Sequence, residues 1–118
     1  MQYLLLIYSS ESRWNQFSEA ELNKIFGEYM DYNKSLIESG HYKGGNRLDY
    51  TSKAKTVRVR EGKRSVTDGP FAETKEQLGG YFVVEAKDLD EAIELAARIP
   101  GSRWGSIEVR PIPPMMTR

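Results

Sequence analysis

The chain has 118 residues with one His and no Cys, and its 17 Lys and Arg residues balance 17 Asp and Glu residues. The absence of Cys excludes disulfides, thiolate metal sites and Cys nucleophiles, and a single histidine excludes a zinc site that needs two imidazoles. The length predicts one domain, and the net charge of zero argues against bulk nucleic-acid binding.

The first predicted element is a strand over residues 3–8, whose sequence YLLLIY is apolar on both alternating faces. This pattern is typical of a strand that is buried on both sides of a sheet. The run is much shorter than the roughly 20 apolar residues that span a bilayer, and no charged segment precedes it. We therefore expect a cytoplasmic protein that does not enter a membrane.

The next element is a helix that begins after a polar connector, residues 9–18. Ser18 and Glu21 have the spacing of a capping box, in which the hydroxyl and the carboxylate each accept a hydrogen bond from a backbone N–H at the start of a helix. Gly40 ends the helix. One face carries a stripe at helical spacing that we expect to be buried: Leu22, Ile25, Phe26, Tyr29, Asn33, Leu36 and Ile37.

A β-hairpin is predicted after residues 41–53, a polar segment that begins with a short strand interrupted by glycines. Apolar and cationic residues alternate in the sequence VRVR, residues 57–60. The sequence EGKR, residues 61–64, supplies a tight turn, and Val66 resumes the apolar face.

The sequence DGPF, residues 68–71, predicts a second turn, because Asp and Gly favour turn conformations and Pro cannot continue a strand. We expect Phe71 to anchor this turn in the core. Thr74 and Gln77 repeat the capping-box spacing, which predicts a single helical turn over residues 72–77.

The remaining elements repeat the order of a buried strand followed by a helix. Residues 81–84 form a second strand that is apolar on both faces, and Asp88 caps a helix that ends at residues 100–101. Residues 107–110 form the last strand, and residues 113–118 form a loose tail. The second helix carries its own apolar stripe: Leu89, Ala92, Ile93, Ala96 and Ile99.

This order of elements predicts a single α+β domain over residues 1–112, of the ferredoxin-like, split βαβ type with an extra β-hairpin. In that topology the first and third core strands, residues 3–8 and 81–84, lie in the middle of the sheet. Helices cover only one face of such a sheet, so the apolar second face would be exposed on a monomer. We therefore predict a homodimer whose two sheets face each other.

The sequence of residues 67–112, TDGPFAETKEQLGGYFVVEAKDLDEAIELAARIPGSRWGSIEVRPI, resembles the DGPF subgroup of the YCII-related proteins. The N-terminal MQYLLLIY and the sequence EYMDYNKSLIESG of the first helix resemble the same group, so the resemblance covers nearly the whole chain. It implies a dimeric α/β-barrel built from ferredoxin-like subunits. Many members of the subgroup are associated with extracytoplasmic-function sigma factors, which suggests a sigma-factor partner.

In the wider YCII-related family, a His on the first helix pairs with an Asp in an active site, and some relatives are enzymes that act on small cyclic substrates. When the sequences are aligned on the ESG end of the helix, this chain has Tyr29 in place of that His. A Tyr hydroxyl, with a pKa of about 10, is a poor base at neutral pH. The His–Asp chemistry is therefore not expected here, and the sequence leaves open whether the protein is an enzyme.

Tyr29 and Asn33, two polar residues on the predicted buried face of the first helix, are candidate ligand-binding residues. A few polar groups in an apolar wall are typical of a small-molecule pocket, which would lie between this helix and the sheet. The alternative is a buried pair whose polar atoms bond to the backbone. His41 is either a general base or a partner of the last helix carbonyls.

Charged residues around the hairpin and the DGPF turn are the remaining candidates. Asp68 and Glu73 either act as a pair of carboxylates or have structural roles, Asp68 in the turn and Glu73 at a helix start or in a salt bridge. Arg58 either binds a carboxylate or phosphate or faces solvent. No resident metal or cofactor is expected.

The net charge of zero conceals blocks of alternating sign. Residues 43–67 contain 8 basic and 2 acidic residues, and residues 68–97 contain 2 basic and 8 acidic residues. Two functions are compatible with these patterns. The first is binding, or transformation, of a small molecule in a pocket between the first helix and the sheet. The alternative is a noncatalytic protein-binding or regulatory module that uses its charged surfaces to contact a sigma factor.

Overall fold

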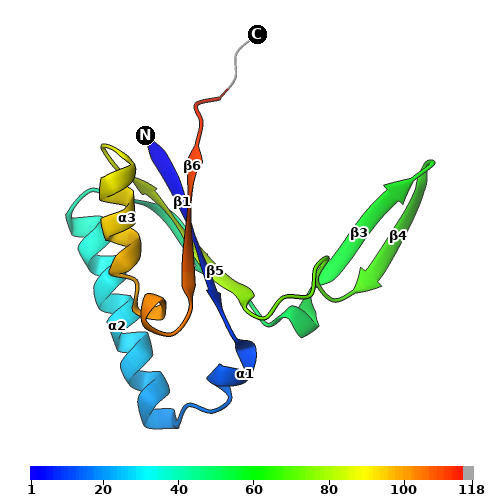
Figure 1. The fold of residues 1–118 in the computed structure, drawn as a ribbon, viewed down its shortest axis with the longest axis horizontal. Helices are drawn as coiled ribbons and strands as arrows, with labels where there is room; N and C mark the ends of the chain where they lie inside the picture. The colour runs from blue at the N-terminus through cyan, green and yellow to red at the C-terminus, as the bar shows by residue number, and fades with distance from the viewer. Residues whose placement is uncertain (116–118) are drawn as a thin grey trace.

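The computed structural model describes residues 1–115, which form an antiparallel sheet with helices on one face and a separate β-hairpin (Figure 1). In chain order the elements are β1 (Gln2–Ser9), α1 (Glu11–Trp14), α2 (Glu19–Glu38), β2 (Tyr42–Arg47), the 3-10 helix η1 (Thr51–Lys53), β3 (Lys55–Arg60), β4 (Lys63–Asp68), β5 (Gln77–Glu85), α3 (Leu89–Ala97), the 3-10 helix η2 (Pro100–Arg103) and β6 (Ser106–Ile112).

The main sheet has the strand order β2-β5-β1-β6, and every neighbouring pair is antiparallel. The central positions of β1 and β5 agree with the prediction from their apolar character on both faces. Helices α2 and α3 each connect a central strand to an edge strand. The chain therefore has a ferredoxin-like α+β fold.

Helices α2 and α3 pack on one face of this sheet and cover its core (Figure 1). Leu5 in the middle of β1 pairs with Phe82 of β5 on one side and with Val109 of β6 on the other. Leu36 of α2 and Ile99 after α3 are fully buried in the same cluster. Burial of one such side chain contributes about 1.5–3 kcal/mol, so these residues hold the helical layer on the sheet.

Helix α2 begins at the predicted capping box. The Ser18 hydroxyl accepts a hydrogen bond from the Glu21 backbone N–H at 3.1 Å, and the Glu21 carboxylate accepts one from the Ser18 backbone N–H at 3.0 Å. The bond from the Ser18 backbone is the main reason why the pKa of the Glu21 carboxyl lies below its ordinary value. After the helix, Gly40 has a φ of 80°, a left-handed conformation that favours glycine.

The buried faces of the two helices differ in part from the predicted stripes. In α2 Tyr32 is buried and Ile37 is exposed, and in α3 Leu95 is buried and Ile93 is exposed. The helices meet where the Tyr32 hydroxyl donates a 2.7 Å hydrogen bond to the Leu95 carbonyl oxygen. Periodicity in the sequence does not reveal which residues face the neighbouring helix, and this contact decides it.

Neither helix covers the opposite face of the sheet, which we call the open face. Alternate residues of the two central strands point to it and are partly exposed: Leu4, Leu6, Tyr81 and Val83. The isolated protomer therefore has an apolar surface on this side of the sheet.

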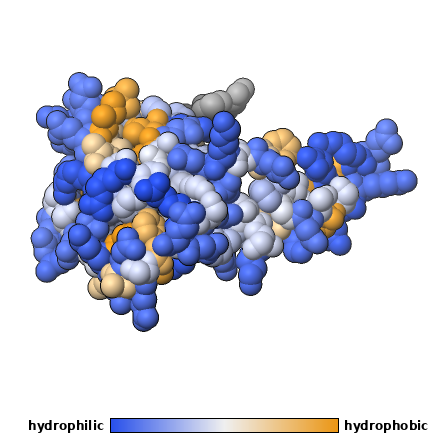
Figure 2. Space-filling model, turned by 60° about the horizontal axis from the view of Figure 1, so that its bottom comes forward, coloured by the Kyte–Doolittle hydropathy of each residue, from blue (hydrophilic) through white to orange (hydrophobic). Residues whose placement is uncertain are grey.

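The hairpin β3–β4, residues 55–68, projects away from the sheet and is called the arm below (Figures 1 and 2). Its turn residues Glu61 and Gly62 both have a positive φ, 52° and 74°, as a two-residue type I′ turn requires. The valines of the arm are more than half exposed: Val57, Val59 and Val66. The radius of gyration, 16.5 Å, exceeds the value of about 13.5 Å expected for a compact domain of this length.

The loop between the arm and β5 differs from its predicted form. Residues 72–77 make no helical turn, because the Thr74 hydroxyl donates to the Glu76 carbonyl oxygen and the Gln77 side-chain amide donates to the Thr74 carbonyl oxygen. Such local bonds compete with helix formation. The expectation that Phe71 anchors the turn in the core is also wrong, since this side chain is 78% exposed.

Two segments near the ends of the chain, the connector after β1 and the segment after β6, complete the comparison with the predicted elements. The connector after β1 contains the short helix α1, which the sequence did not predict. Strand β6 ends at Ile112, and residues 116–118 of the predicted tail lie outside the described residues. None of the described helices has the length and apolar character needed to cross a bilayer.

Candidate functional site

A cavity of about 350 Å³ lies between α2 and the helix-covered face of the sheet, next to α1 and the loop after β2. Its walls include Tyr29 and Asn33, the pair predicted to face a pocket. Five aromatic residues on the helix-covered side are among the lining residues: Trp14, Phe26, Tyr29, Tyr50 and Phe82. The cavity therefore combines mainly apolar walls with a small number of polar groups.

Two glycines in paired strands line this cavity. Gly45 in β2 pairs with Phe82, and Gly80 in β5 pairs with Ile7, so both occupy sheet positions that point toward α2. A Cβ atom on Gly80 would lie 3.0 Å from the Asn46 carbonyl oxygen. A Cβ atom on Gly45 would lie 2.8 Å from Cδ1 of Phe82, so even alanine would force a shift there.

An aromatic cluster forms the end of the cavity next to α1. The Trp14 indole stacks on the Phe26 ring, with centroids 6.5 Å apart and planes 13° from parallel. It also contacts Phe17 and Trp104 edge-on. The Trp14 indole N–H donates a 3.0 Å hydrogen bond to the Ser9 hydroxyl, which fixes the indole in the cavity wall.

Tyr29 lines the cavity, and its hydroxyl contacts Gly101 of η2. Burial raises the pKa of Tyr29 above its ordinary value, although the backbone N–H of Gly101, which donates to the Tyr29 oxygen at 3.2 Å, opposes this effect. Because that oxygen already accepts a bond, the hydroxyl hydrogen is available to a ligand. Asn33 lies one turn further along α2, and within residues 1–115 its side-chain amide has no hydrogen-bond partner.

Three charged residues lie on the rim of the cavity. Glu11 accepts two hydrogen bonds of 2.7 Å from Thr51, one from its backbone N–H and one from its hydroxyl, and this ties the loop after β2 to α1. Asp49 accepts a 2.8 Å bond from the Tyr50 backbone N–H. Arg47 packs on the aromatic wall. The rim thus carries one cation and two carboxylates.

A second, more open hollow of about 460 Å³ lies at the base of the arm. It shares residues 48–50 and Gln77 with the first cavity, and its other walls include Tyr8 and Thr74. The loop over residues 48–50 therefore separates the two hollows and forms a wall of each.

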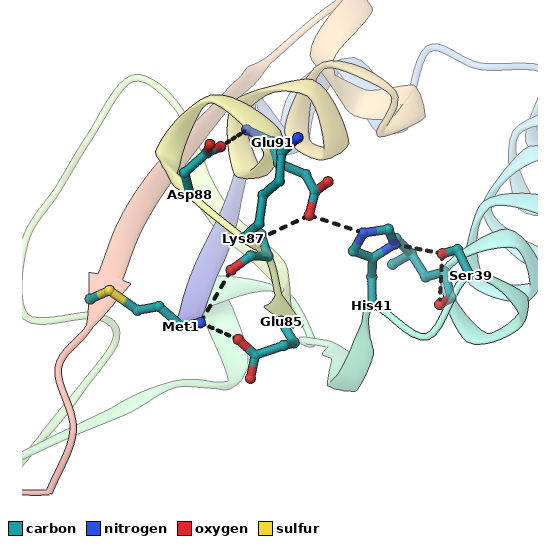
Figure 3. Close-up of polar contacts among 9 residues, drawn as sticks. Met1, Ser39, His41, Glu85, Lys87, Asp88 and Glu91 are labelled. Atoms are coloured by element: carbon teal, nitrogen blue, oxygen red, sulfur yellow. Dashed lines mark hydrogen bonds and ion pairs between the residues drawn. The ribbon is translucent and has the colours of Figure 1, made fainter.

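His41 lies beyond the C-terminal end of α2 and lines neither hollow. Its Nδ1 is 2.6 Å from the Ser39 hydroxyl and its Nε2 is 3.2 Å from the Glu91 carboxylate (Figure 3). The Glu91 carboxylate also accepts a 3.0 Å bond from the Lys87 backbone N–H, which is the main reason why its pKa lies below its ordinary value. In this position His41 connects the end of α2 to the start of α3.

The other charged candidates lie on the arm and the loop after it, outside the cavity. Asp68 forms an ion pair with Lys55 at the base of the arm, and Glu73 is exposed. The Arg58 guanidinium lies over the Phe71 ring, 5.3 Å from its centroid. Among residues 1–115, no three His, Asp or Glu side chains form a group that could hold a metal ion.

Several cavity residues were missed by the sequence analysis, which treated Phe26 as core and gave no role to Trp14 or Arg47. One available signal was a pair of adjacent glycines in each of two strands, residues 44–45 and 79–80. Glycine in a strand leaves a position without a side chain to pack. The consequence becomes visible only once β2 and β5 are known to be neighbours.

This arrangement of elements is found in a solved structure, 5-chloro-2-hydroxyhydroquinone dehydrochlorinase (TftG) from Burkholderia phenoliruptrix AC1100 in complex with 2,5-dihydroxybenzoquinone. The TM-score is 0.56 and the sequence identity 13%, with 96% of this chain and 94% of that chain covered. At this identity the similarity concerns the fold alone.

Sequence comparison gives a more specific assignment. The curated protein described as uncharacterized protein R00369, from Rhizobium meliloti (strain 1021), is 36% identical over 114 residues, which cover 95% of this chain and 92% of that protein. The family model of the YCII-related domain matches residues 1–116. Because this match extends over nearly the whole length of a ferredoxin-like fold, the chain belongs to the YCII-related domain family.

Proposed function

We propose that this protein binds a small, single-ring organic molecule in the cavity between α2 and the sheet. The observation that carries the proposal is the cavity of about 350 Å³, in which Tyr29 and Asn33 lie among aromatic walls. Ligand pockets measure about 300–1,000 Å³ and combine apolar walls with a few placed polar groups. A cavity at the lower end of this range suits a ligand of one ring rather than a large cofactor.

The polar groups of the cavity favour binding over proton abstraction by Tyr29. The Tyr29 hydroxyl stays protonated at neutral pH, because burial raises its pKa, and it therefore acts as a donor. The Asn33 amide both donates and accepts hydrogen bonds. Since the two residues lie one turn apart on α2, they can contact the same edge of a ligand.

The structural neighbour supports a ligand of this size. The dehydrochlorinase structure contains 2,5-dihydroxybenzoquinone, a single ring with oxygen substituents. A related fold therefore accommodates such a molecule, and we propose a ligand of the same general class for this chain.

The proposal is tested by titrating the protein with benzamide and with 2,5-dihydroxybenzoquinone while recording amide NMR shifts. We expect the shifts to concentrate on residues that line the cavity. In the variant Asn33→Phe, the larger side chain would occupy the cavity and abolish these shifts. Lys34→Phe, the same type of change on the exposed side of α2, is the matched control and should leave them unchanged.

Two outcomes would refute the proposal. One is the absence of shifts with both probes in the folded wild-type protein. The other is equal binding by wild type and Asn33→Phe, since the probes would then bind outside the cavity.

We also propose that two copies associate through the open face, which would build the dimeric α/β-barrel expected from the sequence. The partly exposed Leu6 and Val83 on this face support the proposal. The accessible surface is 8549 Å², whereas a monomeric protein of 13.5 kDa typically exposes roughly 6,500 Å². The projecting arm contributes to this excess, so the support for the dimer comes from the apolar residues of the open face.

Within the family, we propose that the chain belongs to the DGPF subgroup, because residues 67–112 carry the sequence features of that group. We further propose a cytoplasmic location, as expected from an N-terminal apolar run that is too short to span a bilayer. The regulatory alternative, a module that contacts a sigma factor, gains no support from the fold or from the related proteins.

A further inference from the structure

We infer that the rim of the cavity selects an aromatic carboxylate, whose carboxylate group binds the Arg47 guanidinium while its ring occupies the cavity. This inference rests on the proposed function and adds the chemical class of the ligand. It is carried by the position of Arg47, by its packing and by the lack of a counter-ion.

The register of the sheet places Arg47 at the cavity. Arg47 pairs with Gly80, and the Gly80 position points toward α2, as its other pairing partner Ile7 does. Asn46, one residue earlier, points to the open face, where its amide donates a 3.0 Å hydrogen bond to the Tyr81 hydroxyl. The Arg47 side chain therefore leaves β2 on the side of the cavity and forms part of its wall.

The Arg47 guanidinium is oriented by the aromatic wall. Its Cζ lies 5.4 Å from the centroid of Phe26, and Phe26 in turn stacks on Trp14. A guanidinium that packs against an aromatic face keeps the N–H groups at its edge available for hydrogen bonds. Such an edge can donate two parallel hydrogen bonds to one carboxylate.

Arg47 has no counter-ion, in contrast to Arg103 and Arg110, the two arginines among residues 1–115 that pair with a carboxylate. Arg103 pairs with Glu28 through two hydrogen bonds of 2.7 Å, and Arg110 pairs with Glu108. Within residues 1–115, no carboxylate lies within salt-bridge distance of Arg47, and its side chain makes no hydrogen bond. The cation on the rim is therefore available to a ligand.

The carboxylates on the rim make contacts that hold the loop after β2. Both oxygens of Glu11 accept hydrogen bonds from Thr51, and Asp49 accepts one from the Tyr50 backbone N–H. Glu11 has its acceptor oxygens engaged, whereas Asp49 keeps one oxygen for a cationic group. A ligand amine is therefore the chemical competitor of a ligand carboxylate, and the experiment includes one.

The inference is tested by titration calorimetry with three single-ring probes of similar shape: benzoate, benzamide and benzylamine. We expect wild type to bind benzoate about tenfold more tightly than benzamide, because charge-assisted hydrogen bonds are stronger than neutral ones. Raising the salt concentration should weaken benzoate binding and leave benzamide binding nearly unchanged.

Arg47→Gln should remove the preference for benzoate, so that benzoate and benzamide bind this variant about equally. Lys43→Gln removes one positive charge from the same strand at an exposed residue outside the cavity, and this control should keep the preference. Circular dichroism of both variants checks that they are folded.

The outcomes separate the two proposals. If wild type binds benzoate and benzamide equally, or binds benzylamine most tightly, the inference about Arg47 is overturned and the proposed function stands. If Lys43→Gln loses the preference as fully as Arg47→Gln, bulk charge explains it and the inference is again overturned. If none of the probes binds the folded protein, the proposed function itself fails.

Discussion

At the scale of single residues, Tyr32 joins the two helices through a buried hydroxyl. Its O–H donates to the Leu95 carbonyl oxygen at 2.7 Å, and its ring contacts Phe82 edge-on at 5.2 Å. Because Tyr32→Phe keeps the ring and removes the bond, we expect the free energy of unfolding in urea to fall by about 1–2 kcal/mol. Tyr50→Phe, at an exposed residue, should change it by less than about 0.5 kcal/mol. Equal losses would contradict the prediction.

Tyr29, which lines the cavity, forms a close contact with Gly101 of η2. A Cβ atom on Gly101 would lie 2.7 Å from the Tyr29 hydroxyl oxygen. Gly101→Ala therefore forces the Tyr29 ring to move and should lower the free energy of unfolding by about 1–3 kcal/mol. Tyr29→Phe removes the clashing oxygen, so the double variant should lose less than the two single variants together. Urea denaturation of all four proteins measures this coupling, and additive losses would show that the contact is absent.

The Glu91 carboxylate makes part of the stability depend on pH. Its pKa is lower in the folded chain, chiefly because the Lys87 backbone N–H donates to it and secondarily because of His41. This contribution is fully present above the ordinary pKa of 4.5 and is lost as the pH falls through the lowered value. Glu91→Gln should therefore lower the free energy of unfolding at neutral pH, and its difference from wild type in this free energy should shrink in acid. Urea denaturation at several pH values measures both.

A control for the Glu91 experiment is Glu94→Gln, which changes an exposed carboxylate on the same helix. The difference in free energy of unfolding between Glu94→Gln and wild type should not follow the pH profile seen for Glu91→Gln. If the effect of Glu91→Gln were the same at neutral and acid pH, the ionised carboxylate would not be the source of the stabilisation.

At the scale of elements, the arm is joined to the rest of the chain through its base. The Gly69 N–H donates a 2.8 Å hydrogen bond to the Ala54 carbonyl oxygen, and β3 and β4 pair with each other in a separate two-stranded sheet. We expect replacement of residues 55–68 by an Asn-Gly turn to shift the thermal midpoint of the protomer by less than about 4 °C. Far-UV circular dichroism measures this, and loss of the folded spectrum would contradict the prediction.

At the scale of the whole molecule, the proposed dimer depends on the open face. Leu6 lies in its centre, paired with Tyr81 on one side and Glu108 on the other. We expect wild type to sediment as a dimer and Leu6→Lys as a monomer, because a charge would be buried between the two sheets. Ile93→Lys, an exposed apolar residue on the helical side, should remain dimeric. A monomeric wild type at tens of micromolar protein would refute the dimer.

The local features of the fold could be predicted from the sequence. The capping box of Ser18, the side-chain cap of Asp88 on the Glu91 N–H and the hairpin of the arm all depend on residues within a few positions of one another. The central placement of β1 and β5 follows from apolar side chains on both faces of each strand. The prediction that Tyr29 and Asn33 face a cavity also rests on local spacing, along one helix.

Only the tertiary structure decided how distant segments combine. The helical periodicity of α2 did not identify Tyr32 as buried, since its partner Leu95 lies in another helix. Asp68 and His41 were chosen as candidates by residue type, and the fold places both outside the cavity. Glycines of β2 and β5 line the cavity, and Arg47 reaches its rim, because the register of two paired strands aligns these positions. Composition and spacing thus determined most of the helices and strands, whereas long-range pairing determined the site. The reason is that contacts between distant segments depend on strand register, which local sequence patterns do not encode.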